Sequence, residues 1–352
     1  LPDYALFMAL KENFGGAAWQ DWPNGARNRT RLGVYKKKLE KEIGYHLFVQ
    51  YMFSLQLDAL RKYANEKGIC LFGDLPIYVA DDSADVWANR AVFDLDSEGR
   101  QNSLAGVPPD YFAEDGQLWG NPLYRWDHEE CLLWWEKRLK HAFDTLDYVR
   151  LDHFRGFDEY YYIPYGDKTA EFGHWEKGPG FELFAEVKKK LGKQNIIAED
   201  LGLLTPSVIK LVKKTGFPGM KILEFAFDSN EDNDYLPHNY IQNCVVYTGT
   251  HDNDTTVGWY DTFNRRDKNF AKRYLNIKGT KDIHWIFIRA ALSSVADTAV
   301  IPMQDYLGLG GEARMNEPST LGKNWKWRMK AGACTDELAW EIRSMIKLYG
   351  RL

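Results

Sequence analysis

Short runs of apolar residues that end in charged or polar ones recur along this chain of 352 residues. Segments with the periodicity of amphipathic helices separate these runs. Because strands that alternate with helices form parallel sheets, this order predicts the α/β class. The runs that we interpret as strands cover residues 69–79, the start of 148–157, 195–202, 220–225, 244–250 and 298–302.

The remaining segments are predicted to be helices or loops. Residues 80–127 have no regular pattern and predict a long inserted loop or subdomain, which in a compact domain is usually functional. Residues 158–180 are also loop-like and rich in aromatic side chains. Helical patterns cover residues 3–13, 28–68, 128–146, 181–191, a segment that begins at 205–206, and 264–274, 281–295 and 335–349.

Several of the predicted strands end in polar residues. In a (β/α)8 TIM barrel, the carboxyl ends of the strands carry the active site. A doubly wound sheet fits the same alternation, but no glycine-rich GxGxxG or Walker loop follows a strand, which weakens a nucleotide-binding interpretation. We therefore expect a single catalytic (β/α)8 barrel domain over residues 1–352, with an insertion at about 80–127.

The stretch 148–157 carries charge where a buried strand should be apolar. With a period of two, Val149 and Leu151 face one side and Arg150 and Asp152 face the other. One explanation is a structural ion pair, although burying such a pair rarely gains stability over apolar packing. The other is a carboxylate that a neighbouring guanidinium keeps ionised for chemistry at the mouth of a barrel.

Three acids follow predicted strands: Asp152, Glu199 and Asp252. Two facing carboxylates allow retaining glycosyl transfer, in which one attacks the anomeric carbon and the other protonates the leaving oxygen. Arg150 beside Asp152 favours the nucleophile there, whereas the apolar residues before Glu199 favour a raised pKa and the acid/base role. Asp252, next to His251, would hold substrate hydroxyls and strain the sugar.

Two other interpretations of these residues stay open at this point. Each acid taken singly could simply cap a helix. A metal site is also conceivable, because His153 and His251 lie beside Asp152 and Asp252, and all four are ligand types. No HxH or HExxH spacing supports such a site, so we expect no metal.

Composition narrows the expected partners. The formal net charge of −5 is spread along the chain, so neither a nucleic acid nor an anionic membrane is expected. Aromatic residues make up 15% of the chain and many lie in predicted loops, where they suit ligands such as sugars. The four scattered cysteines are interpreted as buried thiols of a reducing compartment, which predicts a cytoplasmic protein: Cys70, Cys131, Cys244 and Cys334.

Four motifs of this chain resemble a known family. Residues 74–80 (DLPIYVA), 150–156 (RLDHFRG), 198–202 (AEDLG) and 249–254 (GTHDND) are similar, in order, to the conserved regions of 4-α-glucanotransferases. These enzymes, also called amylomaltases or disproportionating enzymes, form glycoside hydrolase family 77. Residues 106–112 and 119–124 resemble the family's substrate-covering loop and its continuation, and 311–316 resembles its last strand-end motif.

The resemblance implies a retaining transferase that moves α-1,4-glucan segments between chains without a metal or organic cofactor. At the matching positions, Asp152 would be the nucleophile, Glu199 the acid/base and Asp252 the transition-state stabiliser. The implied substrate-binding residues are Asp74, Arg150 and His251 at the cleavage point, and Asp110, Tyr111, Phe112 and Trp119 along the bound glucan.

Two further functions remain alternatives: an α-glucan hydrolase that uses the same site, and a non-catalytic glucan-binding protein. The resemblance also implies that two barrel strands precede Leu1, and the six strands predicted here, where a full barrel has eight, agree with that. We therefore expect a barrel that lacks its first two strands, and that folds poorly and shows little activity when expressed alone. A plastid form is expected if a transit peptide lies upstream of Leu1. Oligomeric state is not predicted.

Overall fold

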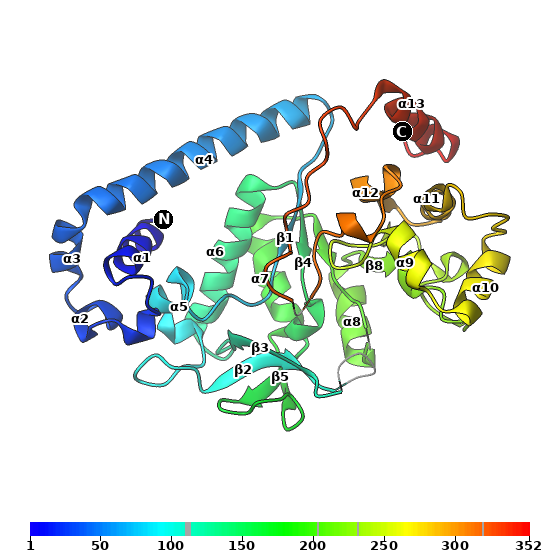
Figure 1. Cartoon of the computed structure of the whole chain (residues 1–352). Coiled ribbons are helices and arrows are strands. Elements are labelled where there is room, and N and C mark those ends of the chain that lie inside the picture. Colours follow the sequence, from blue (N-terminus) through cyan, green and yellow to red (C-terminus); the bar gives the residue numbers. More distant parts are fainter. Residues whose placement is uncertain (110–113, 203, 231, 319) are drawn as a thin grey trace. The chain divides into compact units, whose positions relative to one another are not determined.

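The six predicted strands form two parallel sheets of three strands each. A computed structural model describes residues 1–109, 114–202, 204–230, 232–318 and 320–352 (Figure 1). The chain divides into two compact units, Leu1–Phe217 and Pro218–Leu352, and each unit contains one of the sheets. That both units belong to one barrel domain stays a prediction.

In the first unit, the parallel sheet has the order β1-β4-β7 and is formed by β1 (Phe72–Leu75), β4 (Tyr148–Leu151) and β7 (Ile196–Ala198). Leu151 is paired with Leu75 on one side and with Ala198 on the other. Burial explains the apolar sequence, because Val149, Leu151 and Ala198 have no exposed surface.

Amphipathic helices lie near this sheet in the same unit (Figure 1). They are α6 (Glu129–Thr145), α7 (Gly180–Leu191) and α8 (Pro206–Thr215). Helix α6 buries Trp134, Trp135 and Leu139 in the main core of the unit. Helix α8 begins as predicted at residues 205–206, because the Thr205 side chain accepts a hydrogen bond from the Val208 N–H and Pro206 occupies the first turn.

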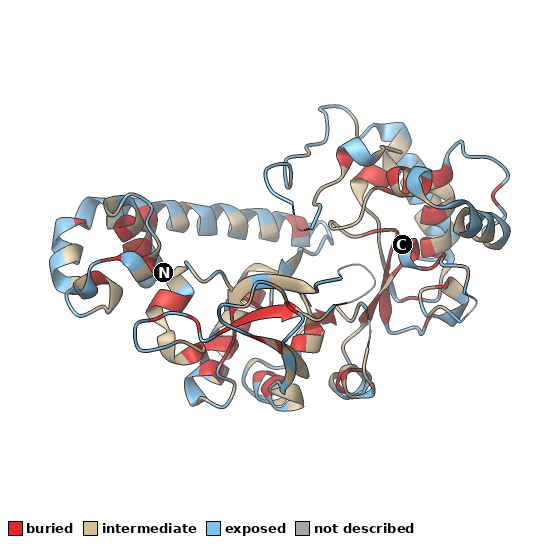
Figure 2. Cartoon of the chain, turned by 60° about the horizontal axis from the view of Figure 1, so that its bottom comes forward, coloured by how far each residue is buried: buried red, intermediate tan, exposed pale blue. Residues whose placement is uncertain are grey.

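The N-terminal part of this unit consists of helices: α1 (Pro2–Asn13), the 3-10 turn Trp19–Asp21, α2 (Asn24–Arg27), α3 (Leu32–Lys38) and α4 (Glu40–Glu66). The single helix predicted over 28–68 is therefore divided at Leu39. Helix α1 is well buried, but α4 has only His46 and Ala64 buried among its 27 residues. Figure 2 shows this long helix mostly in the colours of exposed and intermediate residues.

An antiparallel sheet in the first unit was not predicted from the sequence. Its order is β3-β2-β5-β6, and its strands are β2 (Ser103–Val107), β3 (Gln117–Pro122), β5 (Glu159–Pro164) and β6 (His174–Lys177). The segment 80–127, interpreted as a loop, also contains α5 (Ala84–Ala88) and the 3-10 turn Arg90–Val92. A further 3-10 turn, Phe154–Phe157, directly precedes the segment 158–180. Tyr161 and Ile163 on β5 bury one face of the sheet in a small core. After Glu159 the sequence of β5 is aromatic or apolar on both faces, so it shows no alternation that would reveal this core.

The second unit repeats the alternation of parallel strands and helices. Its sheet has the order β10-β9-β8, with β8 (Gly219–Ile222), β9 (Cys244–Tyr247) and β10 (Thr298–Val300). A core that includes Phe227, Tyr260 and Phe287 packs in this unit. Its helices are α9 (Thr256–Thr262), α10 (Arg265–Tyr274), α11 (Ile283–Ser293), α12 (Met303–Tyr306) and α13 (Asp336–Leu348), with 3-10 turns at Leu223–Phe225, Pro237–Asn239 and Gly311–Ala313.

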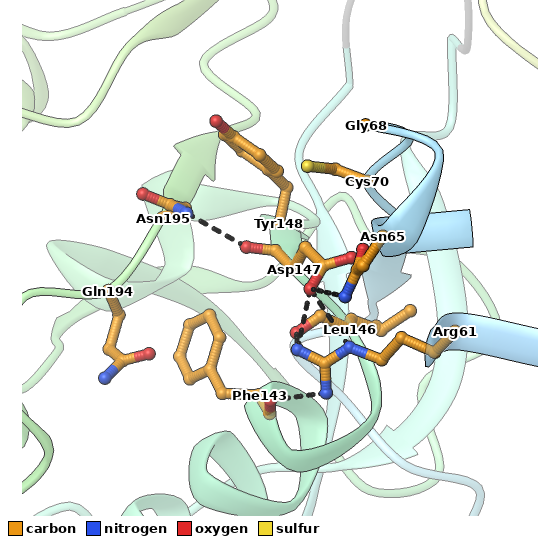
Figure 3. Close-up of a pocket in the computed structure, with 10 residues that line it drawn as sticks. All are labelled: Arg61, Asn65, Gly68, Cys70, Phe143, Leu146, Asp147, Tyr148, Gln194 and Asn195. Atoms are coloured by element: carbon orange, nitrogen blue, oxygen red, sulfur yellow. Dashed lines mark hydrogen bonds and ion pairs between the residues drawn. The ribbon is translucent and has the colours of Figure 1, made fainter. Parts of the chain in front are cut away.

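The amino ends of β1, β4 and β7 border a cavity of about 440 Å³ (Figure 3). The Arg61 guanidinium on α4 donates to the Asp147 carboxylate at 2.7 and 3.0 Å, and also to the carbonyls of Phe143, Asp144 and Leu146 at the end of α6. Asp147 accepts a further bond from the Leu71 N–H at 2.7 Å. The Arg61–Asp147 pair therefore connects two helices to the sheet, which is a structural role.

Two properties of the described residues bear on the expected location and partners. None of their helices is long and apolar enough to cross a membrane. All four cysteines are free thiols, but the prediction that they are buried is wrong for two of them: Cys70 and Cys334 are exposed because they lie in surface connections, whereas Cys131 and Cys244 are buried on α6 and β9.

Candidate active site

The charged residues of the first sheet form one connected group at the carboxyl ends of its strands. Asp74 on β1 is paired in register with Arg150 on β4. The Arg150 guanidinium donates to Asp74 Oδ2 at 2.6 Å and to Asp152 Oδ1 at 3.0 Å. Its side chain is 8% exposed, whereas the side chains of Asp74 and Asp152 are 36% and 39% exposed. The buried positive charge is thus balanced by two carboxylates that reach solvent.

Glu199 follows β7 and lies beside this group. Its backbone N–H donates to the Leu151 carbonyl at 3.0 Å, which extends the pairing of β4 and β7 by one residue. Glu199 Oε2 accepts a bond from the His153 N–H at 2.6 Å, and Oε1 accepts one from the Leu201 N–H at 3.1 Å. The carboxyl is therefore held in place from both sides.

The environment of Glu199 raises its pKa from the ordinary value to about 7. Burial is the largest cause, because it penalises the charged form, and the negative charge of Asp152 adds to it. The positive charge of Arg150 and the two backbone hydrogen bonds act in the opposite direction. Glu199 therefore holds a proton near neutral pH next to a carboxylate that is paired with a guanidinium.

A turn at His153 directs its backbone N–H toward the Glu199 carboxyl. His153 has φ 47°, in the left-handed region, and the chain then enters the 3-10 turn Phe154–Phe157. Burial, followed by the positive charge of Arg155, lowers the pKa of His153 to about 4, so its ring is neutral at physiological pH. The Trp119 ring on β3 packs edge-on against the His153 ring, with 5.0 Å between centroids.

In the second unit, His251 and Asp252 follow β9. His251 Nε2 lies 3.4 Å from Asp252 Oδ2, and Asn316 donates from its side-chain amide to Asp252 Oδ1 at 2.6 Å. Arg314 donates to the Asp252 carbonyl at 2.7 Å. The Asp252 side chain is 39% exposed, and the His251 ring packs 5.1 Å from the exposed ring of Trp325.

The predicted site residues thus fall into three groups. Asp74, Arg150, Asp152 and Glu199 lie together in the first unit, and Trp119 lies on the His153 side of them. His251 and Asp252 lie together in the second unit. The predicted glucan-binding residues Asp110, Tyr111 and Phe112 lie outside the described residues.

Sequence reasoning did not assign roles to Arg314 and Asn316, which hold Asp252. Both lie in the segment 311–316 that resembles a family motif, so a signal was present. Their contacts span 62 and 64 residues of sequence, and only the folded chain reveals them.

The metal interpretation gains no support from these arrangements. Within the described ranges, no group of three or more His, Cys, Asp or Glu side chains is placed to hold a metal ion. The two acids of the first unit instead have different environments, one paired with a guanidinium and one carrying a proton. Acid–base and nucleophilic chemistry needs such a difference.

Known sequences that are similar to this chain include 4-alpha-glucanotransferases. A family model described as 4-alpha-glucanotransferase matches residues 1–335. A 4-alpha-glucanotransferase of Clostridium butyricum is 47% identical over 357 residues, which cover 100% of this chain and 73% of that protein. A 4-alpha-glucanotransferase of Synechocystis sp. is 49% identical over 358 residues, which cover 100% of this chain and 71% of the relative.

Solved structures are similar over the same length. An amylomaltase from Streptococcus agalactiae, in complex with acarbose, superposes with a TM-score of 0.95 at 42% identity and covers 99% of this chain and 72% of its own. An amylomaltase from Corynebacterium glutamicum has a TM-score of 0.74 at 17% identity, covering 100% of this chain and 54% of its own, and supports the fold alone. The predicted α/β barrel class is confirmed, whereas the absence of two strands stays a prediction.

Proposed function

This chain belongs to the 4-alpha-glucanotransferase family, and we propose that Asp152 and Glu199 carry out its glycosyl transfer by a retaining double displacement. The observation that carries the proposal is the position of the two acids on neighbouring strands, each one residue beyond the pair Leu151–Ala198. Parallel strands lie about 4.8 Å apart, close to the separation of about 5–5.5 Å between carboxyls that this mechanism requires.

In the first step, an Asp152 carboxylate oxygen attacks the anomeric carbon of the donor glucan. The bond from that carbon to the glycosidic oxygen breaks, and the Glu199 proton passes to the leaving oxygen. A glucosyl ester of Asp152 results. In the second step, Glu199 takes the proton of an acceptor hydroxyl, whose oxygen attacks the same carbon and releases Asp152. Neither step uses a metal or a cofactor.

The substrates that we propose are α-1,4-glucans, including maltooligosaccharides and chains derived from starch or glycogen. The support is the relative solved with acarbose and the names of the relatives. We assign sugar contacts at the cleavage point to Asp74, Arg150 and His251, and assign to Asp252 the stabilisation of the transition state. Trp119 would face the glucan, together with Asp110, Tyr111 and Phe112.

Transfer and hydrolysis can be separated by counting reducing ends. When maltotriose is the only substrate, transfer releases glucose and longer oligosaccharides while the number of reducing ends stays constant. Hydrolysis raises that number with every turnover. A steady rise that equals the glucose released would favour the alternative hydrolase, and unchanged maltotriose would leave only a glucan-binding role.

A cytoplasmic location is a separate proposal. Its support is the set of free thiols at Cys70, Cys131, Cys244 and Cys334. Two of these thiols are exposed, so an oxidising compartment would modify them. Fractionation of the source cells, with the protein detected by an antibody, tests this proposal.

A further inference from the structure

Glu224 is an acid at a strand end that the proposed mechanism does not use. It lies in the 3-10 turn Leu223–Phe225, which directly follows β8. Unlike the side chain of Asp252, which is 39% exposed, Glu224 is only 5% exposed. A carboxyl this deeply buried presents no surface to a glucan chain, so its role must pass through other residues.

A chain of hydrogen bonds leads from Glu224 to the backbone of Asp252. The Asn253 side chain hydrogen-bonds Glu224. Its Oδ1 accepts bonds from the Thr250 N–H at 2.9 Å and from Thr250 Oγ1 at 2.8 Å. Thr250 Oγ1 in turn accepts a bond from the Asp252 N–H at 3.3 Å.

The backbone of this turn also packs directly on the Glu224 carboxyl. A Cβ atom built on Gly249 would lie 2.7 Å from Glu224 Oε1, so residue 249 must lack a side chain for the carboxyl to fit. The Glu224 N–H donates to the Thr248 carbonyl at 3.2 Å. Glu224 therefore holds the segment from Thr248 to Asn253 in place, both by packing and by hydrogen bonds.

Three charged groups, Asp305, Asp254 and Arg314, lie near Glu224 and act on its pKa together with burial. Burial raises the pKa of Asp305, and the bonds that it accepts from the Thr256 N–H, Thr256 Oγ1 and Thr248 Oγ1 act against this by favouring its carboxylate form. Glu224 Oε1 is buried and has no hydrogen-bond partner among the described residues. Burial, then the charges of Asp305 and Asp254, raise the pKa of Glu224 well above its ordinary value, against the effect of Asn253 and Arg314.

We propose that Glu224 is a neutral positioning residue, which holds the turn carrying Asp252 through Asn253 and Thr250. This inference rests on the proposed role of Asp252 in transfer. A protonated carboxyl resembles an amide in shape and charge, so Glu224→Gln should preserve the support. Glu224→Leu keeps the volume but removes the acceptor for Asn253, so the turn loses its anchor.

The first test measures kcat and KM for maltotriose disproportionation across pH. Glu224→Gln should stay within about twofold of the wild type and keep the shape of its pH profile, whereas Glu224→Leu should lose about 10- to 100-fold in kcat with little change in KM. Thr250→Val, which removes only the hydroxyl that receives the Asp252 N–H, should show the same loss of kcat, and Thr250→Ser should restore activity. If Glu224→Leu does not fold, the two Thr250 variants still test whether the turn that carries Asp252 depends on this chain of hydrogen bonds.

A large loss of activity in Glu224→Gln, or full kcat in both Glu224→Leu and Thr250→Val, would overturn the proposal. The second test does not depend on activity and therefore remains valid even if the proposed function fails. The infrared difference between the wild type and Glu224→Gln at about pH 8 should contain the C=O stretch of a protonated carboxylic acid. A carboxylate band in its place would show that Glu224 is charged and that the inference is wrong.

Discussion

Asp152 and Glu199 occupy equivalent positions on two neighbouring parallel strands, each directly after the register pair Leu151–Ala198. The backbone fixes both positions, because the Glu199 N–H donates to the Leu151 carbonyl and the Phe154 N–H donates to the Glu199 carbonyl at 3.1 Å. Their carboxyl groups therefore interact, and the negative charge of Asp152 contributes to the raised pKa of Glu199. This coupling leads to the first three predictions.

The rate of transfer should fall as pH rises through the pKa of Glu199. The proposed first step needs a protonated Glu199, and the pKa of Glu199 is raised to about 7. Above that pH, kcat/KM should decrease by about tenfold per pH unit. Initial rates of glucose release from maltotriose between about pH 5 and pH 9 provide the measurement. A profile that stays flat to the alkaline end would contradict the acid/base role.

Replacement of Asp152 should abolish transfer without unfolding the chain. Asp152→Asn removes the proposed nucleophile, so turnover should drop by at least about 1,000-fold. The same change removes a neighbouring negative charge and should lower the pKa of Glu199, which a carboxyl-labelled NMR titration can follow.

A matched control is Asp144→Asn, on the exposed end of α6, where the carboxylate pairs with Lys140 in an i,i+4 bridge. This variant should keep wild-type activity. If Asp152→Asn also retained activity, the nucleophile would have to be sought elsewhere.

Glu199→Gln should stabilise the fold more at alkaline than at acidic pH. A carboxyl with a raised pKa binds its proton more tightly in the folded state, so wild-type stability declines as pH rises from the ordinary value of 4.5 through about 7. Glutamine carries no charge and escapes this loss. The midpoint of thermal unfolding of the variant, relative to the wild type, should therefore rise by about 2 °C or more between pH 5 and pH 8. If the unfolding midpoints of the variant and the wild type differed by the same amount at both pH values, the pKa of Glu199 would not be raised in the folded state.

Much of the first sheet and its acids could be predicted from the sequence, because charges at the ends of short apolar runs conflict with burial. Arg150 in β4 and Asp152 directly after it stand out for this reason, as Glu199 does after β7. The antiparallel strands were missed for the opposite reason. In β5 the residues that follow Glu159 are aromatic or apolar on both faces, so no alternation distinguishes its two sides.

The supports of the site could not be predicted, since they join distant segments. Glu224 lay within a predicted strand, but only the fold shows that it meets Asn253 and faces Asp305. Asn316 reaches Asp252 across 64 residues. Such contacts depend on how strands and loops pack, whereas a periodic pattern reports only which face of its own element is buried.

Helix α4 should limit the solubility of the chain. Many large apolar side chains project from it, among them Phe48, which is 61% exposed, and Phe53, which is 58% exposed. Phe48→Glu combined with Phe53→Glu should reduce binding of a hydrophobic dye and raise the concentration that stays soluble, while the unfolding midpoint changes little. Lys62→Glu on the same helix is a control that changes charge without removing apolar surface. Equal dye binding by the double variant and the wild type would show that the dye does not bind to the apolar side chains of α4.

Even a conservative replacement of Arg150 should reduce activity, because its guanidinium donates hydrogen bonds to two different carboxylates. One guanidinium nitrogen donates to Asp74 at 2.6 Å and another to Asp152 at 3.0 Å. The compact ammonium of lysine cannot reproduce this planar fork, so Arg150→Lys keeps the charge but releases one of the carboxylates. We expect kcat to fall by about 10- to 100-fold, with most of the folding stability retained.

Arg155→Lys provides the comparison from the same stretch, since that guanidinium packs over the Trp175 ring at 3.8 Å. It should cost stability through lost stacking and leave kcat close to the wild-type value. Steady-state kinetics and thermal melts of both variants separate the two effects. If Arg150→Lys retained full kcat, the orientation of Asp152 would not depend on the fork, and positive charge alone would explain why an arginine occupies a buried strand.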